Sequence, residues 1–535
     1  MTQLPEFLGS TASRILPRIL TQVCRDPSAP FYGSCDRNWW HYKIRDFPSI
    51  ILQQAGYSLA TAAELPANSE SRDKLLEIAK ASALFWNERA IRHGAFEEYY
   101  PFEQGYPPAA FSTLAVAKLC HQGVVALSEI RKGLKIAVGQ LTTRFEAQAA
   151  NQQIAGTAAL SVIRSLDRTL ISENLFNEIL SKTLALQHPE GWFPEYDGPD
   201  LGYLAVSIDC LWDIFDHTND DRVRPAIHSA ADYIAWFILS PIGKAGMHNS
   251  RNTDYLVPYG LVRLALEDPA CSASAVVTRF FSREPKEPTF HCFDAVDDRY
   301  WCHYTGHSVF RALALLKKKT FQRPQHELET ARPTNKPGSG HSLLSSVGGA
   351  TALVSARKGA ITTARWPKGA VANDFGWLVD TGRQLYVTHW WSNDWKVEGD
   401  VGNTSCEGYL VSHKEHTSTP LKHLILRCGS FILGRWLIKV LKRLVIFKKP
   451  ENKLHFSRTV GWDKEILVIN DTLQGLSPAV TITRAPRTSK RHVASADSYH
   501  PEDLQMLVGT TRTENITLSG GTFTCETRYL KAVGS

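Results

Sequence analysis

The chain has 535 residues, of which 43% are hydrophobic and 21% are charged. This length exceeds what one ordinary core holds, so at least two domains are expected, and the composition excludes a largely disordered or fibrous protein. The formal net charge of +7 favours an acidic partner without identifying it.

Residues 1–60 show no sustained periodic pattern, and we expect an irregular N-terminal segment there. The first twenty residues interleave Arg14 and Arg18 with short apolar stretches and contain neither a continuous apolar core nor a signal-peptide cleavage site. We therefore expect a cytoplasmic location, with secretion by a non-standard route left open. Because no run of about 18 uncharged apolar residues occurs, no transmembrane segment is expected.

Helical periodicity dominates residues 61–320, where apolar residues recur at the spacing i, i+3, i+4. The predicted helices cover residues 73–92, 108–122, 153–166, 173–187, 201–216, 223–240, 258–267 and 306–317. Five of them begin at nearly constant intervals, near Pro108, Gln153, Leu201, Pro258 and Gly306. The intervals of about 45 to 57 residues match the length of a two-helix unit in stacked helical repeats. The sequence therefore predicts an (α/α) toroid of helical hairpins.

The pattern changes after residue 320. Residues 321–344 collect Pro and Gly and are expected to form a linker. Beyond them, short strand-like runs alternate with Gly, Asp and Asn turns. These runs lie at residues 350–363, 384–391, 454–460, 465–470 and 480–483. The predicted fold class is therefore multidomain, α then β, with the toroid at residues 61–320 and an antiparallel β-sandwich at residues 345–535.

One segment of the second domain, residues 431–450, is both apolar and basic. Its cations are Arg435, Lys439, Lys442, Arg443, Lys448 and Lys449. As a helix it suits the surface of an anionic membrane. The preferred interpretation is a helix or strand pair that covers the sheet with its charges outward, because one basic amphipathic segment is a weak signal.

The loops before the five regularly spaced helices are rich in Tyr, Asn, Glu, Arg and His. They comprise Glu98-Tyr99-Tyr100, Asn151-Gln152, Glu195-Tyr196, the segment from Arg251 to Tyr255 and the segment from Arg299 to Tyr304. If alternate helices begin at the same phase, these loops converge on one rim of the toroid. Hydrogen-bonding side chains backed by positive helix ends suit an anionic ligand.

Three of these pieces carry a resemblance to a known group of enzymes. They are Asn151-Gln152-Gln153, the segment Glu190-Gly191-Trp192-Phe193-Pro194-Glu195-Tyr196 leading to Tyr203, and the segment from Ser250 to Gly260. With the sandwich, the chain resembles the heparinase II/III-like and alginate-lyase-like polysaccharide lyases over roughly residues 30–530. The resemblance implies β-elimination in an acidic, uronate-containing polysaccharide. By position, Asn151 matches the Asn that opens a toroid helix in these enzymes, Tyr203 matches their Tyr, and Glu195 matches their loop acid.

The sequence departs from this family at two places. Gln152 stands where a His is common, and residues 366–371 lack the His-rich motif of the family's sandwich. Two other functions therefore stay open. One is a glycan-binding or C5-epimerase-like protein of surface-polysaccharide metabolism without lytic activity. The other is a toroid glycoside hydrolase, which needs two facing carboxyl groups, and the candidate acids are Asp197, Asp200, Asp294, Asp297 and Asp298.

β-Elimination requires a donor that neutralises the uronate carboxylate, a base for the C5 proton and an acid for the leaving oxygen. The candidate catalytic residues are Asn151, Tyr203, Tyr255 and His303. Tyr203 is the first choice as base and Tyr255 the second, with a His as the alternative for either role. The candidate substrate-binding residues are Gln152, Glu195, Tyr196, Arg251, Asn252 and His389. Among all of these, the Asn, Gln and Arg side chains are suitable carboxylate donors.

No cofactor is expected. The ten cysteines form no CxxC pair, and neither a dinucleotide-binding motif nor a phosphate-binding loop occurs. A structural metal in the sandwich is conceivable at His389, Asp394, Asp400 and His413, but this spacing is loose and no metal is expected. The expected partner is an acidic polysaccharide or oligosaccharide rather than a nucleic acid.

Overall fold

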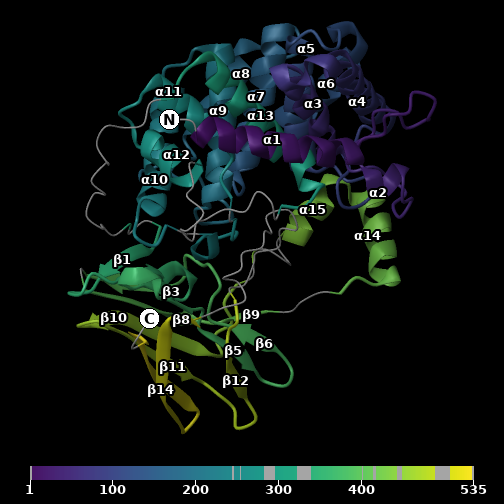
Figure 1. Cartoon of the computed structure of the whole chain (residues 1–535). Coiled ribbons are helices and arrows are strands. Elements are labelled where there is room, and N and C mark those ends of the chain that lie inside the picture. Colours follow the sequence, from purple (N-terminus) through teal and green to yellow (C-terminus); the bar gives the residue numbers. More distant parts are fainter. Residues whose placement is uncertain are drawn as a thin grey trace.

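The computed structural model describes residues 3–243, 246–253, 255–281, 296–321, 336, 339–400, 402–413, 417–442, 447, 449–487 and 507–532. Figure 1 shows a helical body above and a body of β-sheets below it. The helices of the first body are α1 (Gln3–Gln22), α2 (Arg37–Trp40), α3 (Ala55–Ala63), α4 (Arg72–His93), α5 (Tyr106–His121), α6 (Leu127–Thr142), α7 (Ala150–Leu166), α8 (Glu173–Leu184), α9 (Leu201–Thr218), α10 (Val223–Ile238), α11 (Tyr259–Glu267), α12 (Ser272–Phe281) and α13 (Tyr304–Lys318).

Within the described residues, six helices form a closed inner ring. α3, α5, α7, α9, α11 and α13 contact one another in this order, and α13 contacts α3. Each of α3, α5, α7, α9 and α11 pairs with the helix that follows it, while α13 pairs with α1. The predicted (α/α) toroid is confirmed, and the outer helices return the chain so that all inner helices point the same way.

Inner and outer helices differ in how their side chains are buried. α7 is buried at every position from Ala150 to Ile163, and small residues at five of these positions allow its neighbours to approach closely. The outer helix α8 buries one stripe instead, formed by Phe176, Ile179, Leu180 and Thr183. This i, i+3, i+4, i+7 spacing is typical of a helix with one face in water.

The five regularly spaced helix starts all belong to the inner ring. The helices α5, α7, α9, α11 and α13 begin within three residues of the predicted positions. These starts were recognisable because the chain must re-enter the buried ring once per hairpin, which fixes the repeat length.

The expectation of an irregular segment over residues 1–60 is wrong at two places. Residues 55–60 belong to the inner helix α3, and residues 3–22 are helical as well. Residues 3–22 form α1, which completes the outer layer beside α13. Its buried stripe consists of Leu4, Leu8, Ala12, Ile15 and Ile19. The stripe has helical spacing, but polar residues and Pro17 interrupt the apolar residues of this segment, and these interruptions obscured the helical period.

In the described part of the chain the second body contains three antiparallel sheets. Their orders are β1-β2-β3-β4-β13, β14-β15-β11-β10-β8-β7 and β12-β5-β6-β9. The strands are β1 (His341–Ser345), β2 (Thr351–Ser355), β3 (Ile361–Arg365), β4 (Val371–Asp374), β5 (Trp377–Asp380), β6 (Leu385–Val387), β7 (Lys396–Gly399), β8 (Asn403–Tyr409), β9 (Val411–Ser412), β10 (His455–Asp463), β11 (Ile466–Gln474), β12 (Thr481–Arg484), β13 (Leu507–Val508), β14 (Thr510–Ser519) and β15 (Thr522–Lys531). The predicted order of helices followed by antiparallel sheets is confirmed, and each predicted strand run overlaps an observed strand. The predicted linker falls largely outside the described residues, and β1 already begins at His341 within it.

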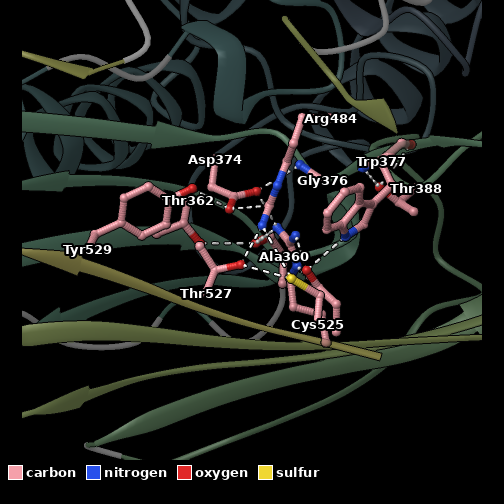
Figure 2. Close-up of polar contacts among 12 residues, drawn as sticks. Ala360, Thr362, Asp374, Gly376, Trp377, Thr388, Arg484, Cys525, Thr527 and Tyr529 are labelled. Atoms are coloured by element: carbon pink, nitrogen blue, oxygen red, sulfur yellow. Dashed lines mark hydrogen bonds and ion pairs between the residues drawn. The ribbon is translucent and has the colours of Figure 1, made fainter. Parts of the chain in front are cut away.

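Polar side chains hold the core of the sandwich together as well as apolar ones. Inward positions alternate along β10, β11 and β15, so Arg458 of β10 lies opposite Asp471 of β11. Figure 2 shows this network, in which Arg484 and Tyr529 converge on Asp374 and the Arg484 side chain also reaches Thr527.

Two helices of the second half, α14 (Pro420–Leu433) and α15 (Arg435–Leu441), do not cover a sheet as expected. We call residues 417–442 the α14–α15 arm. It lies against the helical body beneath α2 (Figure 1), where Arg427 pairs with Asp46 at 2.6 Å and Lys442 pairs with Glu146 at 2.6 Å. The interpretation as a cover for the sheet is therefore wrong, because acidic side chains of the toroid anchor the cations of the arm.

Candidate functional site

The rim formed by the N-termini of the inner helices faces the sandwich. His248, in the loop before α11, lies between Ser355 Oγ and Thr363 Oγ1 of the sandwich, with 2.8 Å from one ring nitrogen to each. Its carbonyl oxygen lies 2.9 Å from Nε2 of His341 on β1. The candidate residues on this rim are therefore enclosed between two bodies.

The loop before α9 reaches across to the start of α7. The Asn151 N–H donates to Oε1 of Glu195 at 3.1 Å, and the Ala150 N–H donates to the Pro194 carbonyl at 2.9 Å. Within the described chain, the buried side-chain oxygens of Asn151 and Gln152 have no hydrogen-bond partner. Two buried amide oxygens without a protein partner at a helix N-terminus leave acceptor capacity for a bound molecule.

Arg251 is the centre of the candidate site. Its Nη1 donates to Oε2 of Glu195 at 3.0 Å, and its Nη2 donates to the Tyr203 hydroxyl at 3.4 Å. The guanidinium also lies 4.4 Å from the ring centre of Tyr196 and 4.6 Å from that of Tyr203. Arg251 therefore links the loop acid, the two predicted tyrosines and, through Glu195, the start of α7.

Burial raises the pKa of Glu195 to about 8, although Arg251 and the Asn151 N–H oppose the shift. Near neutral pH this carboxyl is largely protonated, so it neutralises little of the positive charge of Arg251. That charge then remains available for an anionic ligand.

Asp200 holds the frame of the site. One carboxylate oxygen accepts the Tyr203 N–H at 3.1 Å as the N-cap of α9, and the other accepts the Thr253 N–H at 3.1 Å. This double cap fixes Tyr203 relative to the loop that carries Arg251 and Asn252. Because both oxygens are engaged, Asp200 is a poor choice for the proton-transferring acid of a glycoside hydrolase.

Asn252 is held by the sandwich. Its backbone has a positive φ of 59°, and its side-chain oxygen accepts a hydrogen bond from Lys358. The same ammonium group donates to the carbonyls of Met247 and Asn249 at 2.7 Å each. Lys358 was not among the predicted site residues, because nothing in its sequence neighbours indicates a buried cation that reaches into another domain.

Tyr255 and His303 lie in a second cluster of the rim. The Tyr255 hydroxyl contacts those of Tyr300 and Tyr304, the latter at 3.2 Å, and the His303 ring lies 4.9 Å from the Tyr300 ring. Burial raises the pKa of Tyr255 well above its ordinary value. Burial and the nearby Arg299 lower the pKa of His303 to about 3. Neither group changes its charge near neutral pH.

His389 is contributed by the sandwich, just after β6. It is buried, and burial together with Lys358 lowers its pKa to about 3. Its electrostatic coupling to Lys358 places it near the ammonium group that holds Asn252. Within the described segments, no group of three or more His, Cys, Asp or Glu side chains is arranged to hold a metal ion.

All ten predicted site residues are buried in this structure. Part of the cover comes from the end of the α14–α15 arm and from Phe447. Lys442 lies 5.6 Å above the Tyr196 ring, and Phe447 packs edge-on against it with ring centres 5.6 Å apart. Of the other hydrolase candidates, Asp298 pairs with Arg18 of α1 at 2.6 Å, Asp297 accepts the Tyr300 N–H at 3.0 Å, and Asp294 lies outside the described residues.

No family model and no curated protein matches the chain. Several solved structures do match the chain. The chondroitin AC lyase of Streptomyces coelicolor A3 matches with a TM-score of 0.50 at 8% identity, over 99% of this chain and 78% of that one. Heparinase III matches with a TM-score of 0.46 at 10% identity, over 99% of this chain and 85% of that one.

Heparan sulfate lyase HepC from Pedobacter heparinus matches with a TM-score of 0.38 at 8% identity, over 98% of this chain and 81% of that one. Of these three, only the match to chondroitin AC lyase reaches a TM-score of 0.5. Identities this low concern the path of the backbone and not the reaction. The chain therefore shares its fold, an α/α toroid followed by a β-sandwich, with this chondroitin AC lyase.

Proposed function

We propose that this protein is a polysaccharide lyase that cleaves an acidic, uronate-containing glycan by β-elimination. The observation that carries the proposal is the contact of Arg251 with Tyr203: a buried guanidinium 3.4 Å from a tyrosine hydroxyl, beside a carboxyl that is largely protonated near neutral pH. A nearby cation favours the phenolate form of a tyrosine, which is the form that takes up a proton.

Arg251 also supplies the charge that the uronate requires. A guanidinium neutralises a carboxylate through two parallel hydrogen bonds, and the amides of Asn151 and Gln152 add donors beside the N-terminus of α7. Neutralising the carboxylate makes the C5 proton more acidic. These interactions strengthen as negative charge develops on the carboxylate in the transition state.

The proton then follows a short path. Tyr203 Oη takes the C5 proton, the electrons of that bond form the C4–C5 double bond, and the C4–O4 bond breaks. The protonated Tyr203 returns its proton to the departing O4. Tyr255 is a weaker candidate base because its pKa is raised further from neutrality, and His303 remains neutral and serves as a hydrogen-bonding group.

Access to these groups requires movement of the cover. A polymer reaches Arg251 and Tyr203 only after Phe447 and Lys442 leave the face of Tyr196. We place the α14–α15 arm and Phe447 in the role of a gate. Among the described residues, polar contacts attach the arm to the toroid: Lys442 with Glu146, Arg427 with Asp46, and Ser430 with the Pro101 carbonyl. Gating by a surface segment is common among enzymes that shield a reacting group from water.

The first testable prediction is the effect of Tyr203→Phe. We expect unsaturated uronate, followed by its ultraviolet absorbance, when the wild-type protein meets one of a panel of uronate polysaccharides. Tyr203→Phe is expected to lower the rate by about 10²–10⁴-fold with binding nearly unchanged, because only the hydroxyl is removed. Asn151→Ala is expected to weaken both binding and rate, because its amide acts before and during proton transfer.

Tyr529→Phe is the matched control. It also removes one buried tyrosine hydroxyl with a hydrogen-bond partner, Asp374 at 2.7 Å, but in the core of the sandwich. Its rate should equal that of the wild type. Reducing ends without absorbance would indicate a hydrolase, C5 inversion without cleavage an epimerase, and affinity without turnover a binding protein. Full activity of folded Tyr203→Phe would exclude Tyr203 as the base.

A further inference from the structure

The α14–α15 arm exposes the side of its helix that a globular protein normally buries. Six residues of α14 follow helical i, i+3, i+4 spacing and form one stripe. The stripe comprises Leu421, Leu424, Ile425, Cys428, Phe431 and Ile432. All six are exposed, and Ile425 and Ile432 expose 61% and 76% of their surface.

The opposite side of α14 determines this orientation. Arg427 makes two hydrogen bonds to Asp46, of 2.6 and 2.8 Å, and Ser430 donates to the Pro101 carbonyl. These polar contacts attach the helix to the toroid and turn its apolar stripe toward solvent. A surface helix without an external partner would be expected to pack the other way.

The apolar surface continues beyond α14. Trp436 and Val440 of α15 are exposed, and Phe102 of the toroid is exposed while its ring lies 5.2 Å from that of Phe431. Both the arm and the body therefore contribute to one patch. A patch shared by two separate segments is more consistent with a binding surface than with a single misplaced side chain.

The chain segment that carries most of the patch has charges of one sign. Residues 417–450 contain eight Lys and Arg and no Asp or Glu, in a chain whose net charge is +7. The segment thus accounts for the whole positive balance of the protein. The charge complement of this surface is anionic, and its exposed Ile, Phe and Trp side chains require an apolar phase as well.

We propose that the α14–α15 arm docks the protein on an anionic lipid bilayer, with both helices lying in the plane of the interface. α14 has 14 residues, about 21 Å of helix, which is shorter than the roughly 30 Å hydrocarbon core. Apolar side chains enter the boundary with the acyl chains while Lys and Arg contact the headgroups. An acidic glycan would complement the cations but not the apolar stripe. A second copy of the chain would place its own eight cations against the eight of the first.

Vesicle flotation of the full chain tests this proposal. The protein should float with vesicles of phosphatidylcholine and phosphatidylglycerol, much less with phosphatidylcholine alone, and should be partly released by salt. Ile425→Glu/Ile432→Glu should lower the bound fraction at least roughly tenfold, because two charges enter the stripe. Ile516→Glu/Leu518→Glu is the matched control on β14, where the two residues expose 50% and 61% of their surface. Its bound fraction should not change.

An environment-sensitive dye on Cys428 reports where contact occurs. Cys428 is exposed within the stripe, and a labelled Cys428→Ser sample supplies the blank. A blue shift with anionic vesicles is expected. The proposal is overturned if the protein does not float, or if the variant in the stripe floats as well as the wild type. It is overturned equally if the chain sediments without vesicles as a dimer that this variant dissociates, or binds chondroitin sulfate beads but no vesicle.

Discussion

The most deeply buried charges of the sandwich form one network rather than separate pairs. Arg458 donates to both carboxylate oxygens of Asp471, at 2.6 and 2.8 Å, and lies 3.1 Å from Asp374. Asp374 in turn accepts from Arg484 at 2.6 Å (Figure 2). Trp377 donates its indole N–H to Asp471 at 2.8 Å. Although burial acts in the opposite direction, the two arginines hold the pKa of Asp374 well below its usual range.

Asp471→Ala is predicted to cost about 3–5 kcal/mol of unfolding free energy, because it leaves the fully buried Arg458 short of a partner. Chemical denaturation measures this. The double variant Arg458→Met/Asp471→Leu should lose much less unfolding free energy, because it removes both charges together. Glu407→Ala breaks the exposed Lys396–Glu407 pair on the neighbouring strands and should leave the denaturation midpoint unchanged. Equal losses in all three variants would contradict a role for charge pairing in the core.

Glu195 gives the candidate site a pH dependence of predictable sign. Below its pKa of about 8 the carboxyl is neutral, and above it the carboxylate competes with a uronate for Arg251. Affinity for a uronate oligosaccharide should therefore fall roughly tenfold as the pH rises through this range. In Glu195→Gln the decline should disappear. Calorimetric titration at several pH values measures both proteins, and a decline of equal size in the variant would assign it to another group.

At the scale of elements, the toroid was far more predictable than the site. Five inner helices could be recognised because their apolar runs begin at nearly constant intervals, whereas the nine-residue inner helix α3 was not among the predicted helices. The outer helix α1 was missed because a single stripe interrupted by Pro17 carries little signal. The arm was recognised as apolar and basic, but whether its stripe points inward depends on Asp46 and Pro101, hundreds of residues away.

The candidate site, like the elements, could be predicted from the sequence only in part. Arg251 and Glu195 lie on loops, and Tyr203 in the first turn of α9, that the repeat brings together, so their proximity could be anticipated from sequence. Lys358 could not, because its role depends on how one body docks on another. Local pattern determines which residues reach the rim, whereas the pKa of each group depends on burial by partners distant in sequence.

The role of α1 as a toroid helix predicts the effect of shortening its side chains. Leu8 is completely buried, whereas Leu16 on the same helix is half-buried. Leu8→Ala should cost about 2–5 kcal/mol of unfolding free energy, and Leu16→Ala considerably less, because only the first leaves a cavity. Thermal or chemical denaturation compares them. A negligible effect of Leu8→Ala would show that α1 adds nothing to the stability of the ring.

At the scale of the whole molecule, the sandwich functions as part of the rim. It supplies Lys358 to the loop of Asn252, and Trp391 to the loop before α9, where its indole N–H lies 3.3 Å from the Asp197 carbonyl. At Gly198 a Cβ atom would lie only 2.2 Å from the Trp391 ring. Such close contacts mean that the two bodies meet through the candidate site itself, so their docking and the geometry of the site are coupled.

Lys358→Met tests this coupling directly. The substitution keeps the length of the side chain but removes the donor to Met247, Asn249 and Asn252, so buried acceptors lose their partner at a cost of at least about 2 kcal/mol. We expect calorimetry to resolve separate unfolding transitions for the toroid and the sandwich. We also expect the affinity of this variant for a glycan to fall.

Lys396→Met is the control for this last prediction, because it removes an exposed ammonium group of the same domain that pairs only across β7 and β8. It should keep a single transition at the wild-type temperature. If Lys358→Met unfolds like this control, the docking of the two bodies does not depend on the buried lysine. The link from the sandwich to Asn252 would then be a consequence of docking and not its cause.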